Sequence, residues 1–361
     1  MKNKSIKILF VFFTLFSCSK GNGEENNVPT GKEAITVSTN KTTFNYSDKL
    51  NVNDFSFTKE DGTSISSSSI EIEGFDAYNN RKQNVKFIDK ESKDYGYFEL
   101  KLKPIDSFKV LLISNSHGED VMHYSFELAT SAGCKDFRFV NMFMAGAQMG
   151  SHVTNIKTDF DGYQFQDYKG GDPEITTAVT IKEAVEADNW DFIILQQISS
   201  NSRKPSFIND MNTLMDYCFE HCSNKNVKFL YNMPFAYANL APETIVETFW
   251  DGSPLKMYQN IAEVTRDYVS KVERIETVIP MGTAAQNAAS VIGDNEIHRD
   301  ALHMNDFGRF VIGHAFVSKI TGHDVAEMTF TGSYETKMKD LALKASELAL
   351  LNPYEVSDME K

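Results

Sequence analysis

The distribution of hydrophobic residues divides the chain into two parts. From about Ala34 to Pro104, short runs alternate apolar and polar residues, as in Tyr97 to Leu102, and turn residues such as Asp61-Gly62 separate the runs. Alternation with a period of two is typical of strands that bury one face. The sequence therefore predicts a small antiparallel β-sandwich over residues 34–104.

Beyond Pro104, continuous apolar runs alternate with stretches of helical periodicity. Continuous apolar runs are typical of parallel strands that are covered on both faces. This pattern predicts an α/β domain over residues 106–355, a three-layer α/β/α sandwich with its reactive groups at the carboxyl ends of the strands. The expected strands are Val110–Ile113, Phe137–Met144, Asp191–Gln196, Val227–Tyr231 and Thr277–Pro280, and the expected helices include Asp120–Ser131, Phe207–Cys222 and Leu255–Val272.

The first residues have the pattern of an export signal. Three lysines precede the apolar run from Ile8 to Phe16, and small Ser17 precedes Cys18. The segment Leu15–Cys18 resembles the lipobox of bacterial lipoproteins, which predicts a signal peptide over residues 1–17 and a lipid anchor on Cys18. The alternatives are an ordinary secretory signal or an uncleaved anchor. Residues 18–33 are mostly polar and are expected to form a flexible tether, with the protein on the bacterial outer membrane or cell surface.

Net charge argues against nucleic acid as a partner, and the number of cysteines argues against a complete disulfide framework. The 361 residues carry a formal net charge of −14, which repels nucleic acid because its binding needs clustered lysine and arginine. Apart from Cys18, the chain has three cysteines, an odd number that leaves at least one free thiol. Cys218, His221 and Cys222 lie within one helical pattern and lack a second pair of ligands, so core packing is favoured over zinc. The sequence predicts no metal and no cofactor.

Two short segments contain residues suited to nucleophilic catalysis. The first predicted strand runs into Ser114-Asn115-Ser116-His117, and a serine at such a junction presents its hydroxyl at the sheet edge. Helix capping is the alternative role for these residues. Near the C-terminus, Asp300 and His303 are spaced so that the carboxylate can orient the imidazole as a base for a serine. A polar surface turn is the alternative there.

Together these segments resemble the motifs of the SGNH (GDSL-like) hydrolase superfamily, especially a branch common in Bacteroidota. Its Gly-Asn-Ser block is matched by Ser114–His117, and its closing Asp-x-x-His block by Asp300 and His303. The intervening blocks of that branch are matched, in the same order, by Asn141–Gly146, Trp190–Gln197 and Pro280–Asn287. The N-terminal part resembles the immunoglobulin-like modules that precede catalytic domains in such proteins, where a spacer role is favoured over carbohydrate binding.

The resemblance implies roles for individual residues. Ser116 would be the nucleophile, His303 the general base and Asp300 the group that orients it. The oxyanion hole would comprise the backbone N–H groups of Ser116 and Gly146 and a side-chain amide. Gln197 is favoured over Gln196 for this amide because it lies nearer the end of the strand. Residues that could line the substrate cleft are Asn115, His117, Gln196 and His152. A structural hydrogen bond is favoured for His152. For His117, a capped position in the loop is favoured over a substrate contact or a second titrating group.

The implied function is a serine esterase that removes acetyl or similar acyl groups from a glycan or another small ester. Three departures from the superfamily pattern favour an alternative. Ser114 and Ala145 replace glycines, and His117 stands where an apolar residue is common. The alternative is a glycan-binding or scaffold lipoprotein that retains the fold without the chemistry.

Overall fold

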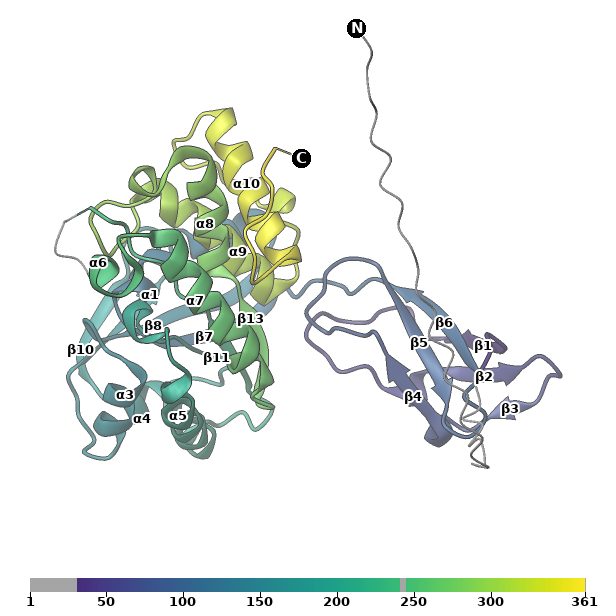
Figure 1. The fold of residues 1–361 in the computed structure, drawn as a ribbon. Helices are drawn as coiled ribbons and strands as arrows, with labels where there is room; N and C mark the ends of the chain where they lie inside the picture. The colour runs from purple at the N-terminus through teal and green to yellow at the C-terminus, as the bar shows by residue number, and fades with distance from the viewer. Residues whose placement is uncertain (1–30, 241–244, 361) are drawn as a thin grey trace, which may run out of the picture.

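The computed structural model describes residues 31–240 and 245–360, in which a small β module precedes a larger α/β domain (Figure 1). The predicted signal peptide, Cys18 and the tether up to Thr30 lie outside the described residues. None of the described helices is long and apolar enough to cross a membrane.

The N-terminal module consists of two three-stranded antiparallel sheets. Phenylalanine side chains from both sheets meet between them, with the ring centroids of Phe57 and Phe87 5.4 Å apart. The predicted small antiparallel structure is confirmed, and the immunoglobulin-like topology stays a prediction. One sheet comprises β1 (Ile35–Ser38), β2 (Ser56–Lys59) and β3 (Ser64–Ile65), and the other β4 (Ile70–Glu73), β5 (Gln83–Asp89) and β6 (Tyr95–Leu100).

The domain is built on a seven-stranded sheet in the order β10-β9-β8-β7-β11-β12-β13. Its five parallel strands are those that the apolar runs predict: β7 (Ser107–Ser114), β8 (Asp136–Phe143), β11 (Phe192–Leu195), β12 (Lys228–Asn232) and β13 (Ile275–Ile279). The predicted three-layer fold is confirmed. The sequence did not predict the antiparallel edge hairpin of β9 (Tyr163–Tyr168) and β10 (Glu174–Val179), because β10 is largely exposed and lacks an apolar run.

Alternate residues of the central strand β7 contribute to two different cores. Val110 and Leu112 pack toward one layer of helices, whereas Leu111 and Ile113 pack toward the other. The first layer contains α1 (Ser116–Met122), α2 (Ser125–Ala132), α8 (Met281–Ile292), α9 (Asp306–Thr321) and α10 (Thr336–Leu351). The second contains α3 (Met149–Ile156), α4 (Ile181–Glu186), α5 (Ile208–His221), α6 (Ile245–Trp250) and α7 (Pro254–Asp267). The expected single helix over Asp120–Ser131 is two helices, α1 and α2.

The cysteine predictions can be compared directly with the second core. Cys218 and Cys222 are buried in it, as the prediction of core packing expects, and they form no disulfide. Cys134 is also a buried free thiol, in the middle of the short segment between α2 and β8.

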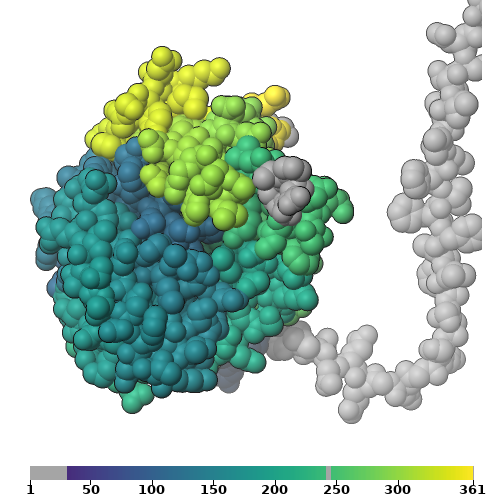
Figure 2. Space-filling view, turned by 90° about the vertical axis from the view of Figure 1, so that its left-hand side faces the viewer, coloured from purple at the N-terminus to yellow at the C-terminus, as the bar shows by residue number. Residues whose placement is uncertain are grey.

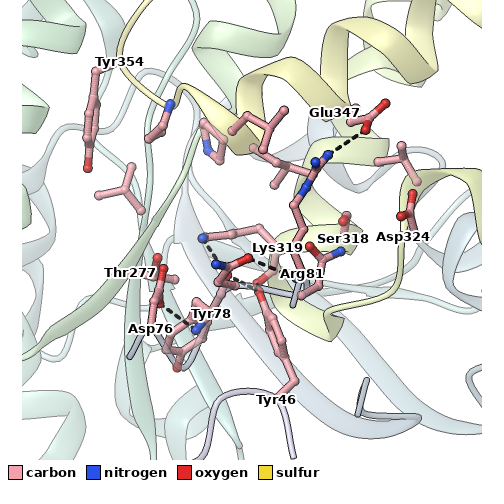
Figure 3. Close-up of a pocket in the computed structure, with 18 residues that line it drawn as sticks. Tyr46, Asp76, Tyr78, Arg81, Thr277, Ser318, Lys319, Asp324, Glu347 and Tyr354 are labelled. Atoms are coloured by element: carbon pink, nitrogen blue, oxygen red, sulfur yellow. Dashed lines mark hydrogen bonds and ion pairs between the residues drawn. The ribbon is translucent and has the colours of Figure 1, made fainter. Parts of the chain in front are cut away.

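The module contacts the domain through a few defined groups. The Tyr46 hydroxyl donates to the backbone carbonyl of Lys319 at 2.9 Å, and the ring of Tyr46 lies against Gly322. Arg81 pairs with Glu347 at 2.6 Å. A cavity of about 350 Å³ lies at this contact, with residues from both parts around it (Figure 3).

Candidate active site

The junction between β7 and α1 places Ser116 in the first turn of a helix. Asn115 caps α1, its Oδ1 accepting from the N–H of His117 at 3.1 Å. Its Nδ2 donates to the carbonyl of Ala147 at 2.9 Å, which ties the turn after β8 to this helix end. Backbone N–H groups in a first helical turn have no partner within the helix. The capping role therefore falls on Asn115, and the Ser116 hydroxyl takes no part in it.

A loop before α9 brings His303 to Ser116. The Ser116 Oγ lies 2.9 Å from Nε2 of His303, although 187 residues separate them in sequence. Nδ1 of the same ring lies 3.0 Å from both carboxylate oxygens of Asp300. With Nδ1 donating to the carboxylate, Nε2 is free to accept from the serine hydroxyl. Figure 2 shows one face of the domain, on which the light-green segment near residue 300 lies against the blue segment from the earlier part of the chain.

The loop also determines the charge state of Asp300. Partial burial favours the neutral acid, but the N–H groups of Leu302 and His303 and the His303 ring donate to the carboxylate and together lower its pKa. An ionised carboxylate is the form that can hold the imidazole in one orientation.

His117 is buried beneath this loop. Its Nε2 lies 3.1 Å from the carbonyl of Leu302, which can only accept, so Nε2 carries the ring proton. Nδ1 then accepts from the Ser199 hydroxyl at 3.2 Å. Burial lowers the pKa of His117 to about 4 and keeps this tautomer neutral. The ring is packed at 4.4 Å from that of Phe235, so its contacts are structural and it is enclosed rather than open to a cleft.

A buried carboxylate supports the same loop from the other side. Asp120, in α1, accepts from Arg299 at 2.7 Å and from Arg309 at 2.9 Å through one oxygen. Its other oxygen accepts from the N–H of Met304 at 3.0 Å. The Asp120 side chain is fully buried. Residues on either side of the Asp300–His303 loop are therefore bonded to the helix that begins with Ser116.

The structure accommodates both residues that stand where the superfamily has glycine, Ser114 and Ala145. The Ser114 Oγ donates to Oδ1 of Asn141 at 2.7 Å, and Gly118 leaves the space that this hydroxyl occupies. In the second block, Gly146 has a φ of +63°, which favours glycine, whereas Ala145 does not have a positive φ. The glycine that the turn requires is thus present, and Ser114 is held by a hydrogen bond.

The two candidate amides have different partners. Gln196 is fully buried, its Nε2 3.3 Å from Oδ1 of Asn115 and its Oε1 accepting from Asn232 at 2.6 Å. Gln197 uses its Oε1 to accept from the N–H groups of Met149 and Ile198, at 3.0 and 2.9 Å. Gln196 therefore has both ends of its amide in the internal network, whereas these two hydrogen bonds of Gln197 use its amide oxygen.

His152 lies in the core rather than at a cleft. It is fully buried, and its Nδ1 lies 2.7 Å from the hydroxyl of Tyr163. Burial lowers its pKa to about 4. A structural histidine, the favoured alternative from the sequence, fits this position.

Several supporting residues were not singled out from the sequence: Asp120, Ser199, Arg299 and Arg309. Each is an ordinary polar residue in its local pattern, and its partners lie up to 189 residues away. The position of Arg299 next to Asp300 was the only available local signal.

A comparison with protein families finds one that matches most of the α/β domain. The family described as "Domain of unknown function (DUF4886)" matches residues 109–349. A solved structure of a DUF4886 family protein from Bacteroides uniformis is 30% identical with a TM-score of 0.66, covering 71% of this chain and 99% of that one. No curated protein matches.

More distant solved structures are also similar. An acetylxylan esterase from Geobacillus stearothermophilus is 11% identical with a TM-score of 0.31, covering 64% of this chain and 99% of that one. An aryl esterase from M. smegmatis is 13% identical with a TM-score of 0.38, covering 59% of this chain and 98% of that one.

Proposed function

Because this chain belongs to the DUF4886 family of domains of unknown function, we propose a function from its site: it is a serine esterase of the SGNH type. The observation that carries the proposal is the continuous hydrogen-bonded chain from Ser116 Oγ through His303 to Asp300. A nucleophile, a base and a group that orients the base are the three parts of acyl-transfer catalysis by serine.

The proposed reaction has two halves. Ser116 Oγ attacks the ester carbonyl while its proton passes to Nε2 of His303, and that proton then goes to the departing alcohol oxygen as the ester C–O bond breaks. In the second half, water gives a proton to His303 and attacks the acyl-enzyme, which releases the acid and restores Ser116. The charge on the carbonyl oxygen would be stabilised by the N–H groups of Ser116 and Gly146 and the amide of Gln197.

The openness of the site favours an ester on a large molecule. The Asp300 side chain is 50% exposed, and Leu302 in the same loop is 44% exposed. A lipase needs an apolar groove for its acyl chain, whereas a polymer with small acyl groups needs access from solvent. The substrate class proposed is therefore an acylated carbohydrate, processed by a protein anchored through Cys18 at the bacterial outer membrane or cell surface. The hydrogen bond of Ser114, the backbone conformation of Ala145 and the structural contacts of His117 weigh against the alternative of a non-catalytic scaffold.

Acetate release tests this proposal. The purified protein is incubated with acetylated xylan, other acetylated polysaccharides and a small aryl acetate, and acetate is measured. We expect release from at least one acetylated glycan, and loss of release in Ser116→Ala with unchanged circular dichroism. Turnover in Ser116→Ala equal to that of the wild type would refute the assignment.

A further inference from the structure

Three side chains with metal-ligating atoms meet at the amino ends of β7 and β8. The proposed triad lies at the opposite, carboxyl end of the parallel strands. Asp106 precedes β7, Cys134 precedes β8, and His323 follows α9. β7 and β8 start in register, Ser107 beside Asp136, and the N–H of Lys135 donates to the carbonyl of Asp106 at 2.9 Å. The active-site residues follow the carboxyl ends of these strands, so the two sites are separated by the length of the sheet.

The distances between the three donor atoms are near those that a single bound ion requires. A carboxylate oxygen of Asp106, Sγ of Cys134 and a ring nitrogen of His323 all lie within 4.8 Å of one another. Asp106 Oδ1 and His323 Nε2 are 2.9 Å apart. In a tetrahedral zinc site with ordinary bond lengths, such donor atoms are about 3.3 to 3.6 Å apart. Side-chain movements of about 1 Å would therefore complete the geometry.

A second carboxylate orients the histidine. Nδ1 of His323 lies 2.7 Å from Oε2 of Glu327, so this nitrogen carries a proton and donates it. Nε2, on the other side of the ring, faces Asp106. Histidines that bind metals commonly donate their other N–H to a carboxylate in this way. The His323 carbonyl also accepts from Ser318 Oγ at 2.6 Å, which holds the backbone of this residue.

The thiol and the carboxylate complete a suitable ligand set. Cys134 is 5% exposed, and its thiol makes a long hydrogen bond of 3.9 Å to the carbonyl of Ile105. Asp106 has a side chain that is 47% exposed, so an ion can enter from solvent. A thiolate and an imidazole favour Zn²⁺ over Mg²⁺ or Ca²⁺, which prefer oxygen ligands.

We propose that Asp106, Cys134 and His323 bind Zn²⁺, with water as the fourth ligand and Glu327 orienting the histidine. Nε2 of His323 lies 2.9 Å from a carboxylate oxygen of Asp106 and so carries a proton in the metal-free protein. On binding, the Cys134 thiol and Nε2 of His323 each release a proton to solvent, and the sulfur and this nitrogen bond to the metal. The two anionic ligands, Asp106 and Cys134, then balance the charge of the ion. The site joins the start of β7, the start of β8 and the end of α9, next to Gly322 where Tyr46 of the module packs. Its role is structural, and the proposal is independent of esterase activity.

Cobalt substitution tests the thiolate directly. The purified protein is treated with a chelator, the chelator is removed, and Co²⁺ is titrated while the absorption spectrum is recorded. We expect saturation at one Co²⁺ per chain, a thiolate-to-cobalt charge-transfer band, and displacement of the ion by Zn²⁺. Cys134→Ser should lose the band, whereas Cys222→Ser, the matched change at another buried thiol, should keep it. No band in the folded wild type, or an undiminished band in Cys134→Ser, overturns the proposal.

Zinc affinity provides a second measurement that does not require replacing the cysteine. Competition with a chromophoric chelator should show Zn²⁺ binding about 10- to 100-fold weaker in Glu327→Gln, the loss typical of an outer-sphere partner. Asp106→Asn should weaken binding at least as much. Asp136→Asn changes an exposed carboxylate at the amino end of β8. It is the control and should bind Zn²⁺ as the wild type does. Equal affinity in all four proteins overturns the proposal.

Discussion

Nε2 of His117 donates to the carbonyl of Leu302 across 3.1 Å, and this hydrogen bond ties the helix of the proposed nucleophile to the loop of the proposed base. Leu302 lies between Asp300 and His303, so the bond restrains the loop at its centre. His117 acts on the proposed chemistry through the loop, as a positioning residue, because its ring is enclosed by the protein.

Replacing His117 should lower turnover with little effect on substrate binding. A misplacement of about 1 Å at a reacting group can lower a rate about 100-fold. We therefore expect His117→Ala to lower kcat by about 10- to 100-fold with KM nearly unchanged, measured on an aryl acetate. His117→Gln, which keeps an N–H donor, should recover part of the rate. An unchanged kcat in His117→Ala would show that the loop is held without this bond.

Asp120→Asn should destabilise the domain strongly. The substitution leaves Arg299 and Arg309 beside a neutral group. Their side chains are 37% and 18% exposed, so solvent screens the charges left behind. We therefore expect a loss of about 2 to 3 kcal/mol, below the cost of breaking a fully buried ion pair. The free energy of unfolding in urea measures this loss. Asp306→Asn is the control, since Asp306 pairs with the same Arg309 but is 72% exposed, where about 1 kcal/mol or less is expected. Equal losses in the two variants would contradict the importance of the buried carboxylate.

Gly118→Ala should be destabilising although alanine is the better helix former. A Cβ at Gly118 would lie 1.9 Å from Ser114 Oγ and 2.6 Å from Asn141 Oδ1. Overpacking of this kind costs about 1 to 3 kcal/mol. Combining Gly118→Ala with Ser114→Ala removes the nearest clash, so urea unfolding of the double variant should show a loss smaller than the sum of the single losses. Additive losses would mean that the two side chains do not compete for this space.

The domain should lose stability between about pH 6.5 and pH 4. Burial lowers the pKa of His117, His152 and His314 to about 4. In the unfolded chain these rings titrate near their ordinary value of about 6.5, so the unfolded state binds protons first as the pH falls. The stability that is fully present above about pH 6.5 is then lost, on the order of 3 kcal/mol per ring.

Urea unfolding as a function of pH measures this effect. His314→Leu removes one of the three rings and should make the decline between about pH 6.5 and pH 4 shallower than in the wild type. Identical declines in the two proteins would show that His314 does not contribute.

The strands of the domain were predictable because their sequences are continuously apolar. Runs such as Val110–Ile113 are buried on both faces, and a strand of that kind has few other possible environments. The β9–β10 hairpin was not predictable in this way, since Glu174–Val179 is an exposed edge strand held by its neighbour rather than by burial.

The proposed triad was accessible from the sequence because its motifs are local. Ser116 follows a strand, and Asp300 and His303 lie within one turn of each other. The ion pairs that hold the loop of the triad could not be predicted from the sequence, because Asp120 meets Arg299 and Arg309 only after the chain has folded. At Cys218, the sequence favoured core packing over zinc binding. It gave no signal that Asp106, Cys134 and His323 would meet, since each lies in a different loop between helices and strands.

Covalent labelling by a fluorophosphonate, followed by intact-mass and peptide mass spectrometry, tests the central claim most directly. The account predicts one adduct per chain, located on Ser116, absent in Ser116→Ala and much slower to form in His303→Ala. A folded wild-type protein that gains no adduct, or one labelled equally well without the Ser116 hydroxyl, would contradict it.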